Sequence, residues 1–135
     1  MSPVVLEDTA LLVTRSRELA VGLAALLLSV PPIRHVERAT ARDALLDRLR
    51  GSKPGLVVLD TEAVGPDVSG VVQAIHAISP TTRYVILGNT VQEVREANEY
   101  AADKMGAAIV KGTDPKGLTA TIERLLVAQQ GTEGR

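Results

Sequence analysis

Cysteine, tryptophan and phenylalanine are absent from this sequence, and its aromatic residues are limited to Tyr84 and Tyr100. Without cysteine, disulfide bonds, thiolate catalysis and cysteine-ligated metal sites are excluded. The scarcity of aromatic rings counts against nucleic-acid modules that stack bases and against cofactor or sugar pockets lined by aromatic side chains. The core must therefore be built from leucine, valine, isoleucine and alanine.

An excess of charge of either sign is also missing. The 15 basic and 16 acidic residues give a formal net charge of −1, so binding to nucleic acid or to a membrane surface is not predicted. The longest largely apolar run, residues 19–30, is too short to span a bilayer. No basic segment of a secretory signal opens the chain, so we expect a cytoplasmic protein. The 135 residues, 45% of them apolar, predict one globular domain with a core over residues 9–129.

One apolar run stands out as the centre of the chain. Leu56–Leu59 contains two β-branched residues, follows Lys53-Pro54-Gly55 and ends on Asp60. This pattern predicts a strand that is buried on both faces. Ligands and chemistry gather at the carboxyl ends of such strands, so Asp60 is a candidate functional residue. The alternative is that Asp60 only ends the strand and begins a turn.

Hydrophobic periodicity predicts five strands that alternate with five helices. The strands are predicted over residues 10–13, 33–38, 55–60, 83–87 and 107–110. The helices are predicted over residues 17–29, 41–50, 68–78, 91–104 and from Pro115 to a polar tail at 129–135. Ser16 and Thr40 are the expected N-caps of the first two helices. Residues 1–8 are predicted to form a loose arm, although Val4–Leu6 would suit an extension of the first strand.

The alternation of strands and helices predicts a parallel sheet with right-handed crossovers and helices on both faces. We therefore predict an α/β fold, a flavodoxin-like (βα)5 three-layer sandwich. Its five parallel strands are expected in the order 2-1-3-4-5. If the chain belongs to a longer protein, we expect a linker to begin within residues 129–135.

Four segments, in this order, resemble the receiver domain of two-component response regulators, and the resemblance covers nearly the whole chain. Leu56–Asp60 resembles the family's third strand, and Pro66–Gly70 resembles the loop and glycine that open its third helix. Gly106–Gly112 resembles its Gly-Ala turn, fifth strand and pocket lysine, and Asp114–Leu118 resembles the opening of its fifth helix. Each motif alone is weak, but the ordered set is fairly specific. The resemblance implies a signal-transduction module, with Asp60 as the phospho-acceptor and Lys111 in the phosphate pocket.

The sequence departs from the family where the family binds metal. Receivers carry two acidic residues at the end of the first strand, which hold Mg²⁺ beside the acceptor aspartate, and here those positions are Thr14 and Arg15. Mg²⁺ needs hard oxygen ligands and charge compensation, and a guanidinium offers neither. The acidic pair Glu7-Asp8 precedes the body of the strand, at the wrong end for a metal site.

Other departures affect the phosphate pocket and the switch. The fourth strand of receivers ends on a threonine or serine whose hydroxyl bonds the phosphoryl group, and here Gly88 takes that place, followed by Asn89. The aromatic switch residue of the fifth strand is replaced by Ala108 or Ile109. The loop after Asp60 is slightly longer than usual and lacks the family's Met-Pro pair.

These departures lead to a hypothesis about charge. Phosphoryl transfer to a carboxylate depends on cations that neutralise the developing negative charge, and Lys111 is the cation that remains. We expect Arg15, Asp60 and Lys111 to form a standing ion network that replaces the metal and keeps Asp60 ionised. The alternative is that Arg15 points into solvent and the pocket is merely eroded.

Other candidate residues are interpreted as structural. His35 and His76 lie on different elements without a cluster of partners, so we expect no metal or catalytic role for them. Ser16 has no histidine in register for a triad, and no nucleotide-binding glycine motif is present. A moderately basic region is interpreted as a solvated face, with a partner-binding patch as the alternative. It consists of Arg34, Arg38, Arg42, Arg48 and Arg50.

We therefore predict an atypical receiver domain that is not an enzyme, needs no cofactor and regulates a partner by protein–protein contact. A histidine kinase or an output protein would suit as partner, and a homodimer would use residues 100–102, the fifth strand and residues 118–126. The alternative for those leucines is that they pack their helix onto the sheet. Two other functions stay open: a phosphorylatable receiver in which Glu62 helps Asp60 to bind Mg²⁺, and a small flavodoxin-like cofactor-binding enzyme.

Overall fold

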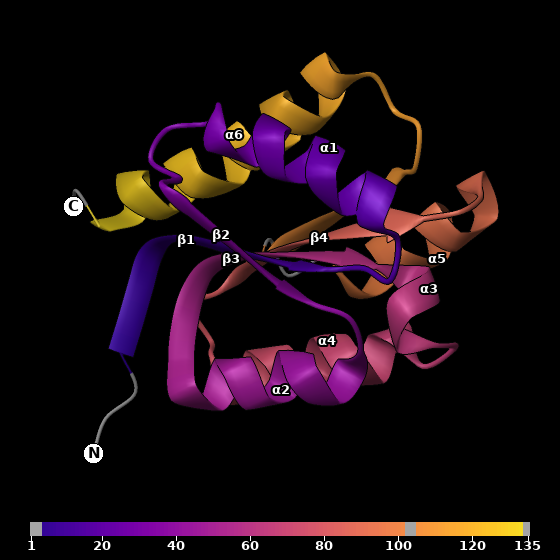
Figure 1. The fold of residues 1–135 in the computed structure, drawn as a ribbon, viewed down its shortest axis with the longest axis horizontal. Coiled ribbons are helices and arrows are strands. Elements are labelled where there is room, and N and C mark those ends of the chain that lie inside the picture. The colour runs from indigo at the N-terminus through magenta and orange to yellow at the C-terminus, as the bar shows by residue number, and fades with distance from the viewer. Residues whose placement is uncertain (1–3, 102–104, 134–135) are drawn as a thin grey trace.

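The computed structural model describes residues 4–101 and 105–133, which form five strands and six helices (Figure 1). The strands are β1 (Val4–Val13), β2 (His35–Ala39), β3 (Ser52–Asp60), β4 (Arg83–Gly88) and β5 (Gly106–Val110). The helices are α1 (Arg17–Leu28), α2 (Arg42–Gly51), α3 (Thr61–Val64), α4 (Val68–Ile78), α5 (Val91–Tyr100) and α6 (Pro115–Glu133).

All strand pairs are parallel, and the strands lie in the order β2-β1-β3-β4-β5. Helices α1 and α6 cover one face of the sheet, whereas α2, α4 and α5 cover the other (Figure 1). The predicted flavodoxin-like three-layer sandwich with strand order 2-1-3-4-5 is therefore confirmed. Because the strands are parallel, their carboxyl ends meet at one edge of the sheet, where the loops that follow them come together.

The two faces of the sheet carry separate apolar cores. Along β3, Leu56 and Val58 pack towards α1 and α6, and Val57 and Leu59 pack towards α2 and α4. Successive side chains of a strand point to opposite faces, so a central strand with a core on each side must be apolar at every position. This explains the unbroken apolar run that ends on Asp60.

The first strand is longer than predicted, because its start pairs with the start of β3. Val4 lies opposite Ser52 in the sheet, so the expected loose arm is wrong for residues 4–8, and residues 1–3 lie outside the described residues. The strand register shifts between Leu6 and Ala10. Gly55 lies beside this irregularity, where a Cβ atom would collide with the carbonyl oxygen of Glu7.

Several helix boundaries also differ from the prediction. The short helix α3 stands where a loop was expected, and α6 continues to Glu133 through most of the expected polar tail. Helix α5 ends at Tyr100, and the expected continuation over residues 102–104 lies outside the described residues. Ser16 caps α1 by accepting a hydrogen bond from the Leu19 N–H, as predicted. The N-cap position of α2 is Ala41 rather than Thr40, and no side chain caps it.

Within residues 4–101 and 105–133, no helix is both long enough and apolar enough to cross a membrane.

Candidate functional site at the carboxyl edge of the sheet

Asp60 is buried at the carboxyl end of the central strand. It is 2% exposed, and both of its carboxylate oxygens accept hydrogen bonds. The Thr14 hydroxyl donates to Oδ2 at 2.8 Å, and the Glu62 backbone N–H donates to Oδ1 at 3.1 Å. The second bond makes Asp60 the N-cap of α3, which is why a helix begins in a segment whose sequence indicates a turn. Asp60 therefore does serve as a cap, but it is also the centre of a charged site.

Lys111 provides the counter-charge from the end of β5. Its Nζ lies 2.6 Å from Asp60 Oδ1, 2.8 Å from Glu62 Oε2 and 2.8 Å from Asn89 Oδ1. Its side chain is 19% exposed. Partial burial lowers the pKa of the ammonium group, but the hydrogen bonds and charges of Asp60 and Glu62 outweigh this effect, so the pKa of Lys111 is raised above the ordinary lysine value. The ammonium thus stays charged and joins the ends of three loops.

Thr14 holds the other side of the Asp60 carboxylate. It is completely buried, and its N–H donates to the Ala39 carbonyl at 3.1 Å, which continues the pairing of β1 with β2. Arg38 donates from Nε and Nη2 to the Thr14 carbonyl oxygen at 3.2 and 3.1 Å. The backbone of Thr14 is therefore fixed from the β2 side, and its hydroxyl points at Asp60.

The predicted network of Arg15, Asp60 and Lys111 is wrong for Arg15. Arg15 is exposed and forms no ion pair with any residue that the structure describes. Arg15 lies in the bend between β1 and α1, one residue past Thr14, which makes the last backbone contact with β2. Thr14 and Glu62, rather than Arg15, complete the network around Asp60 and Lys111.

Gly88 ends β4, and Asn89 follows it beside Lys111. The Gly88 carbonyl accepts a hydrogen bond from the Lys111 N–H at 2.8 Å. A Cβ atom at Gly88 would lie 3.2 Å from both Glu93 Cβ and Val94 Cγ2, which leaves little room for a side chain at this position. Asn89 accepts from Lys111 through its side chain, as described above, and donates its backbone N–H to Glu93 Oε2 at 2.9 Å.

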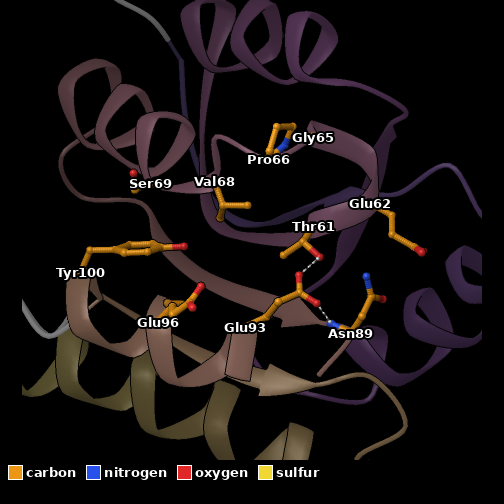
Figure 2. Close-up of a pocket in the computed structure, with 11 residues that line it drawn as sticks. Thr61, Glu62, Gly65, Pro66, Val68, Ser69, Asn89, Glu93, Glu96 and Tyr100 are labelled. Carbon is orange, nitrogen blue, oxygen red and sulfur yellow. Dashed lines mark hydrogen bonds between the residues drawn. The ribbon is translucent and has the colours of Figure 1, made fainter. Parts of the chain in front are cut away.

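Glu93 fixes the first turn of α5 against α3. Thr90 caps α5 by accepting from the Glu93 N–H at 3.1 Å, while the Glu93 carboxylate reaches back to Asn89. The other oxygen of Glu93 accepts from the Thr61 hydroxyl at 3.2 Å, and Figure 2 shows both of these bonds. A chain of polar contacts thus runs from Arg38 on β2, through Thr14, Asp60, Lys111 and Asn89, to Glu93.

A groove of about 510 Å³, which we call the α4–α5 groove, opens beside this chain of contacts (Figure 2). Thr61 and Asn89 lie at one end, Val68 and Ser69 of α4 line one wall, and Glu96 and Tyr100 of α5 line the other. Glu62 also borders the groove, but its carboxylate points away from the Tyr100 end, towards Lys111. Burial raises the pKa of the Tyr100 phenol, and the negative charges of Glu96 and Glu93 raise it further.

The origin of the Tyr100 pKa can be tested with a neutral variant. Glu96→Gln is expected to lower the pKa of Tyr100, because it removes one of the charges that oppose phenolate formation. Glu99→Gln changes an exposed carboxylate on the same helix that does not line the groove, so it serves as the matched control. NMR titration of isotope-labelled tyrosine would measure both, and equal effects of the two variants would contradict the assignment.

The described side chains do not fit a Mg²⁺ site. Among them, no three acidic or histidine side chains gather as a metal-binding group. The Lys111 ammonium lies between the carboxylates of Asp60 and Glu62, where a second cation would meet electrostatic repulsion. The acidic pair Glu7-Asp8 lies about 20 Å from Thr14 along β1, so it cannot contribute ligands.

The remaining candidates lie at the surface. His35 Nε2 lies 4.0 Å from Asp8 Oδ2 at the surface, and His76 is exposed on α4. Three arginines of the basic region meet carboxylates: Arg48 pairs with Glu37, Arg50 pairs with Asp47, and Arg42 lies 3.8 Å from Asp67. Much of the charge of that region is therefore compensated, which agrees with the interpretation as a solvated face.

No protein-family model and no curated protein matches the sequence. Solved structures do match. A CheY-like response regulator receiver domain from Methanospirillum hungatei JF-1 is 18% identical, covers 93% of this chain and 98% of its own, and superposes with a TM-score of 0.75. The signal receiver domain of a DNA-binding response regulator from Colwellia psychrerythraea 34H is 21% identical, with 89% and 98% covered and a TM-score of 0.73. The chain has the receiver-domain fold.

The receiver-domain fold is not confined to structures described as response regulators. An adenylate cyclase structure from Rhodopirellula baltica is 20% identical, with 96% of this chain and 94% of that chain covered and a TM-score of 0.75. At such identities the likeness concerns the fold, so the function must be argued from the side chains of this chain.

Two residues of the site were missed in the sequence. The family resemblance marks Thr14 only as the replacement of an acid, although a hydroxyl at a strand end next to Asp60 can donate to a carboxylate. The sequence holds a signal for Glu93, because Thr90-Val91-Gln92-Glu93 matches the capping-box pattern that places a glutamate at the start of a helix. The contact of Arg38 with the Thr14 carbonyl depends on the order of the strands in the sheet, so the sequence around either residue does not predict it.

Proposed function

We propose that this protein is an atypical receiver-type signalling module that regulates a protein partner by contact, without Mg²⁺-dependent phosphorylation and without enzymatic activity of its own. The observation that carries the proposal is the state of Asp60. Its carboxylate is buried, and Thr14, Lys111 and the Glu62 N–H already occupy both oxygens.

The chemistry of phosphoryl transfer supports this proposal. A phosphoryl group that approaches Asp60 brings negative charge onto a carboxylate, and the barrier falls only if cations neutralise that charge. The cation at hand, Lys111, is shared with Glu62, whose carboxylate would add to the repulsion. At Gly88, where the family has a hydroxyl to bond the phosphoryl oxygens, Glu93 and Val94 leave little room for a side chain.

The partner is proposed to be a protein, with a histidine kinase or an output protein as the classes that the receiver fold favours. The homodimer predicted over α5, β5 and α6 stays a prediction. Leu118, Ile122 and Leu126 are buried in the core between α6 and the sheet, so these three side chains would not contribute to such a contact. Tyr100, which is partly exposed, lines the α4–α5 groove instead.

Incubation with acetyl phosphate and Mg²⁺, followed by intact-protein mass spectrometry, tests the proposal. We expect no phosphoryl adduct under conditions that phosphorylate an ordinary receiver domain run in parallel. An adduct that appears in the native protein and disappears in the Asp60→Asn variant would favour the alternative of a phosphorylatable receiver.

A further inference from the structure

The α4–α5 groove combines negative charge with a flat aromatic wall. Glu93 and Glu96 point into it from successive turns of α5 (Figure 2). Neither forms an ion pair within the described part of the chain: Glu93 accepts bonds from Thr61 and from the Asn89 N–H, and Glu96 accepts one from the Gln92 amide. These donors are neutral, so no basic side chain among the described residues compensates either negative charge.

The remainder of the groove suits a planar cation. The Tyr100 ring extends from α5 across the groove, and Val68 and Pro66 lie on the opposite side (Figure 2). A guanidinium can stack on an aromatic face and donate in its plane to carboxylates on either side, whereas a lysine ammonium is a compact, strongly hydrated point charge. The groove is also large enough for a side chain with its aliphatic stem, which would pack on Val68 and Tyr100.

We propose that the α4–α5 groove is a docking site for an arginine side chain of the protein partner, which stacks on the Tyr100 ring and pairs with the carboxylates of Glu96 and Glu93 along the same helix. The inference rests on the proposed function, in that it gives the chemistry of the partner that the module contacts. We choose an arginine as the occupant because its positive charge complements the carboxylates of Glu93 and Glu96. The chain's own basic region is a poor source of this arginine, because Arg42, Arg48 and Arg50 already meet carboxylates.

The groove also touches the Asp60 network. Glu93 is bonded to the Asn89 N–H, and the Asn89 side chain is bonded to Lys111. An arginine that pairs with Glu93 therefore changes the charge two contacts away from Lys111. Occupation of the groove is expected to alter the environment of Asn89 and Lys111 as well as that of Tyr100.

An amide NMR titration tests the docking site. The probe is a capped pentapeptide with a central arginine flanked by alanine and glycine, and its control is the same peptide with citrulline, which has nearly the same shape without the charge. We expect saturable shifts at Thr61, Ser69, Asn89 and Tyr100 with the arginine peptide and none with the citrulline peptide. Glu96→Gln should weaken the affinity about threefold, the range of a partly exposed ion pair, and the matched control Glu99→Gln should leave it unchanged.

The inference is overturned if the arginine peptide causes no saturable shifts in the groove, if the citrulline peptide binds equally well, or if both glutamate variants weaken binding to the same extent. Its failure is distinct from that of the proposed function. A protein that binds the peptide and is phosphorylated on Asp60 keeps the docking site but loses the proposed function. A protein that does neither keeps the proposed function and loses the docking site.

Discussion

Replacement of Lys111 by methionine is expected to lower the free energy of unfolding by about 2 kcal/mol. The variant keeps the aliphatic stem but leaves the carboxylate of Asp60, which is 2% exposed, without a cation. Removal of one partner of a fully buried pair costs about 3–5 kcal/mol. We expect less here, because Lys111 is partly exposed and Thr14 and the Glu62 N–H still donate to Asp60. Urea denaturation would measure the change.

Two further variants show whether the effect comes from charge. Asp60→Asn keeps the shape and removes the charge, so the double variant with Lys111→Met should recover about 1 kcal/mol relative to Lys111→Met alone. Lys116→Met alters an exposed lysine in the first turn of α6 that forms no ion pair with the residues described, and it should change stability by less than about 0.5 kcal/mol. If Lys111→Met behaves like Lys116→Met, the ion pair does not stabilise the fold.

The stabilisation by Lys111 should disappear at high pH. Because its pKa is raised in the folded protein, the contribution of the ammonium is complete below the pKa of an unfolded lysine, about 10.4. It is lost as the pH rises through the higher pKa of the folded state. The difference in unfolding free energy between native protein and Lys111→Met should therefore stay constant from neutral pH to about 10 and shrink above it. A difference that does not change at high pH would contradict this assignment.

Thr14→Asp is expected to convert the site into one that responds to Mg²⁺. Without metal, the new carboxylate would lie where the buried Thr14 hydroxyl now donates to Asp60 at 2.8 Å, and the repulsion should cost about 2 kcal/mol or more. A divalent cation can bind between the two carboxylates, so Mg²⁺ at about ten times its Kd should restore about 1.4 kcal/mol. Thermal and urea unfolding with and without Mg²⁺ would measure both effects.

The control for that experiment is Thr14→Val, which removes the hydroxyl without adding a charge. It should cost about 1.5–3 kcal/mol, because the lost hydrogen bond is donated to a buried carboxylate, and Mg²⁺ should not change its stability. The native protein should likewise be insensitive to Mg²⁺. If Mg²⁺ stabilises the native protein as much as it stabilises Thr14→Asp, the native side chains already hold the metal and our interpretation of the pocket is wrong.

The fold could be predicted because its signals are periodic and repeated. The apolar run of β3, the helical spacing in Val68–Ile78 and the regular alternation of strands and helices each restrict the topology to the same answer. The wrong predictions concern segments whose structure depends on pairing with a distant strand or on one side-chain hydrogen bond. The start of β1 is a strand because it meets Ser52–Pro54, and α3 begins because the Asp60 carboxylate accepts the Glu62 N–H.

The sequence predicts which loops meet at the site, but it predicts the contacts of the individual side chains less well. Asp60 ends β3, and Asn89 and Lys111 directly follow β4 and β5, so strand order alone brings them together. Whether Thr14 or Arg15 faces Asp60 depends on the phase of one strand end, and a shift by one residue exchanges the two. The aspartate side chain is short, so it accepts a hydrogen bond only from a nearby donor. Here that donor is the Thr14 hydroxyl.

The central claim is that Asp60 is held by Lys111 and Thr14 and does not accept a phosphoryl group with the help of Mg²⁺. An amide NMR titration with Mg²⁺, followed by beryllofluoride as a phosphoryl analogue, tests it most directly. We predict no saturable shifts at Asp60, Asn89 or Lys111. Shifts that begin at these three residues and spread along α5 would contradict the account and identify the protein as a phosphorylation-dependent switch.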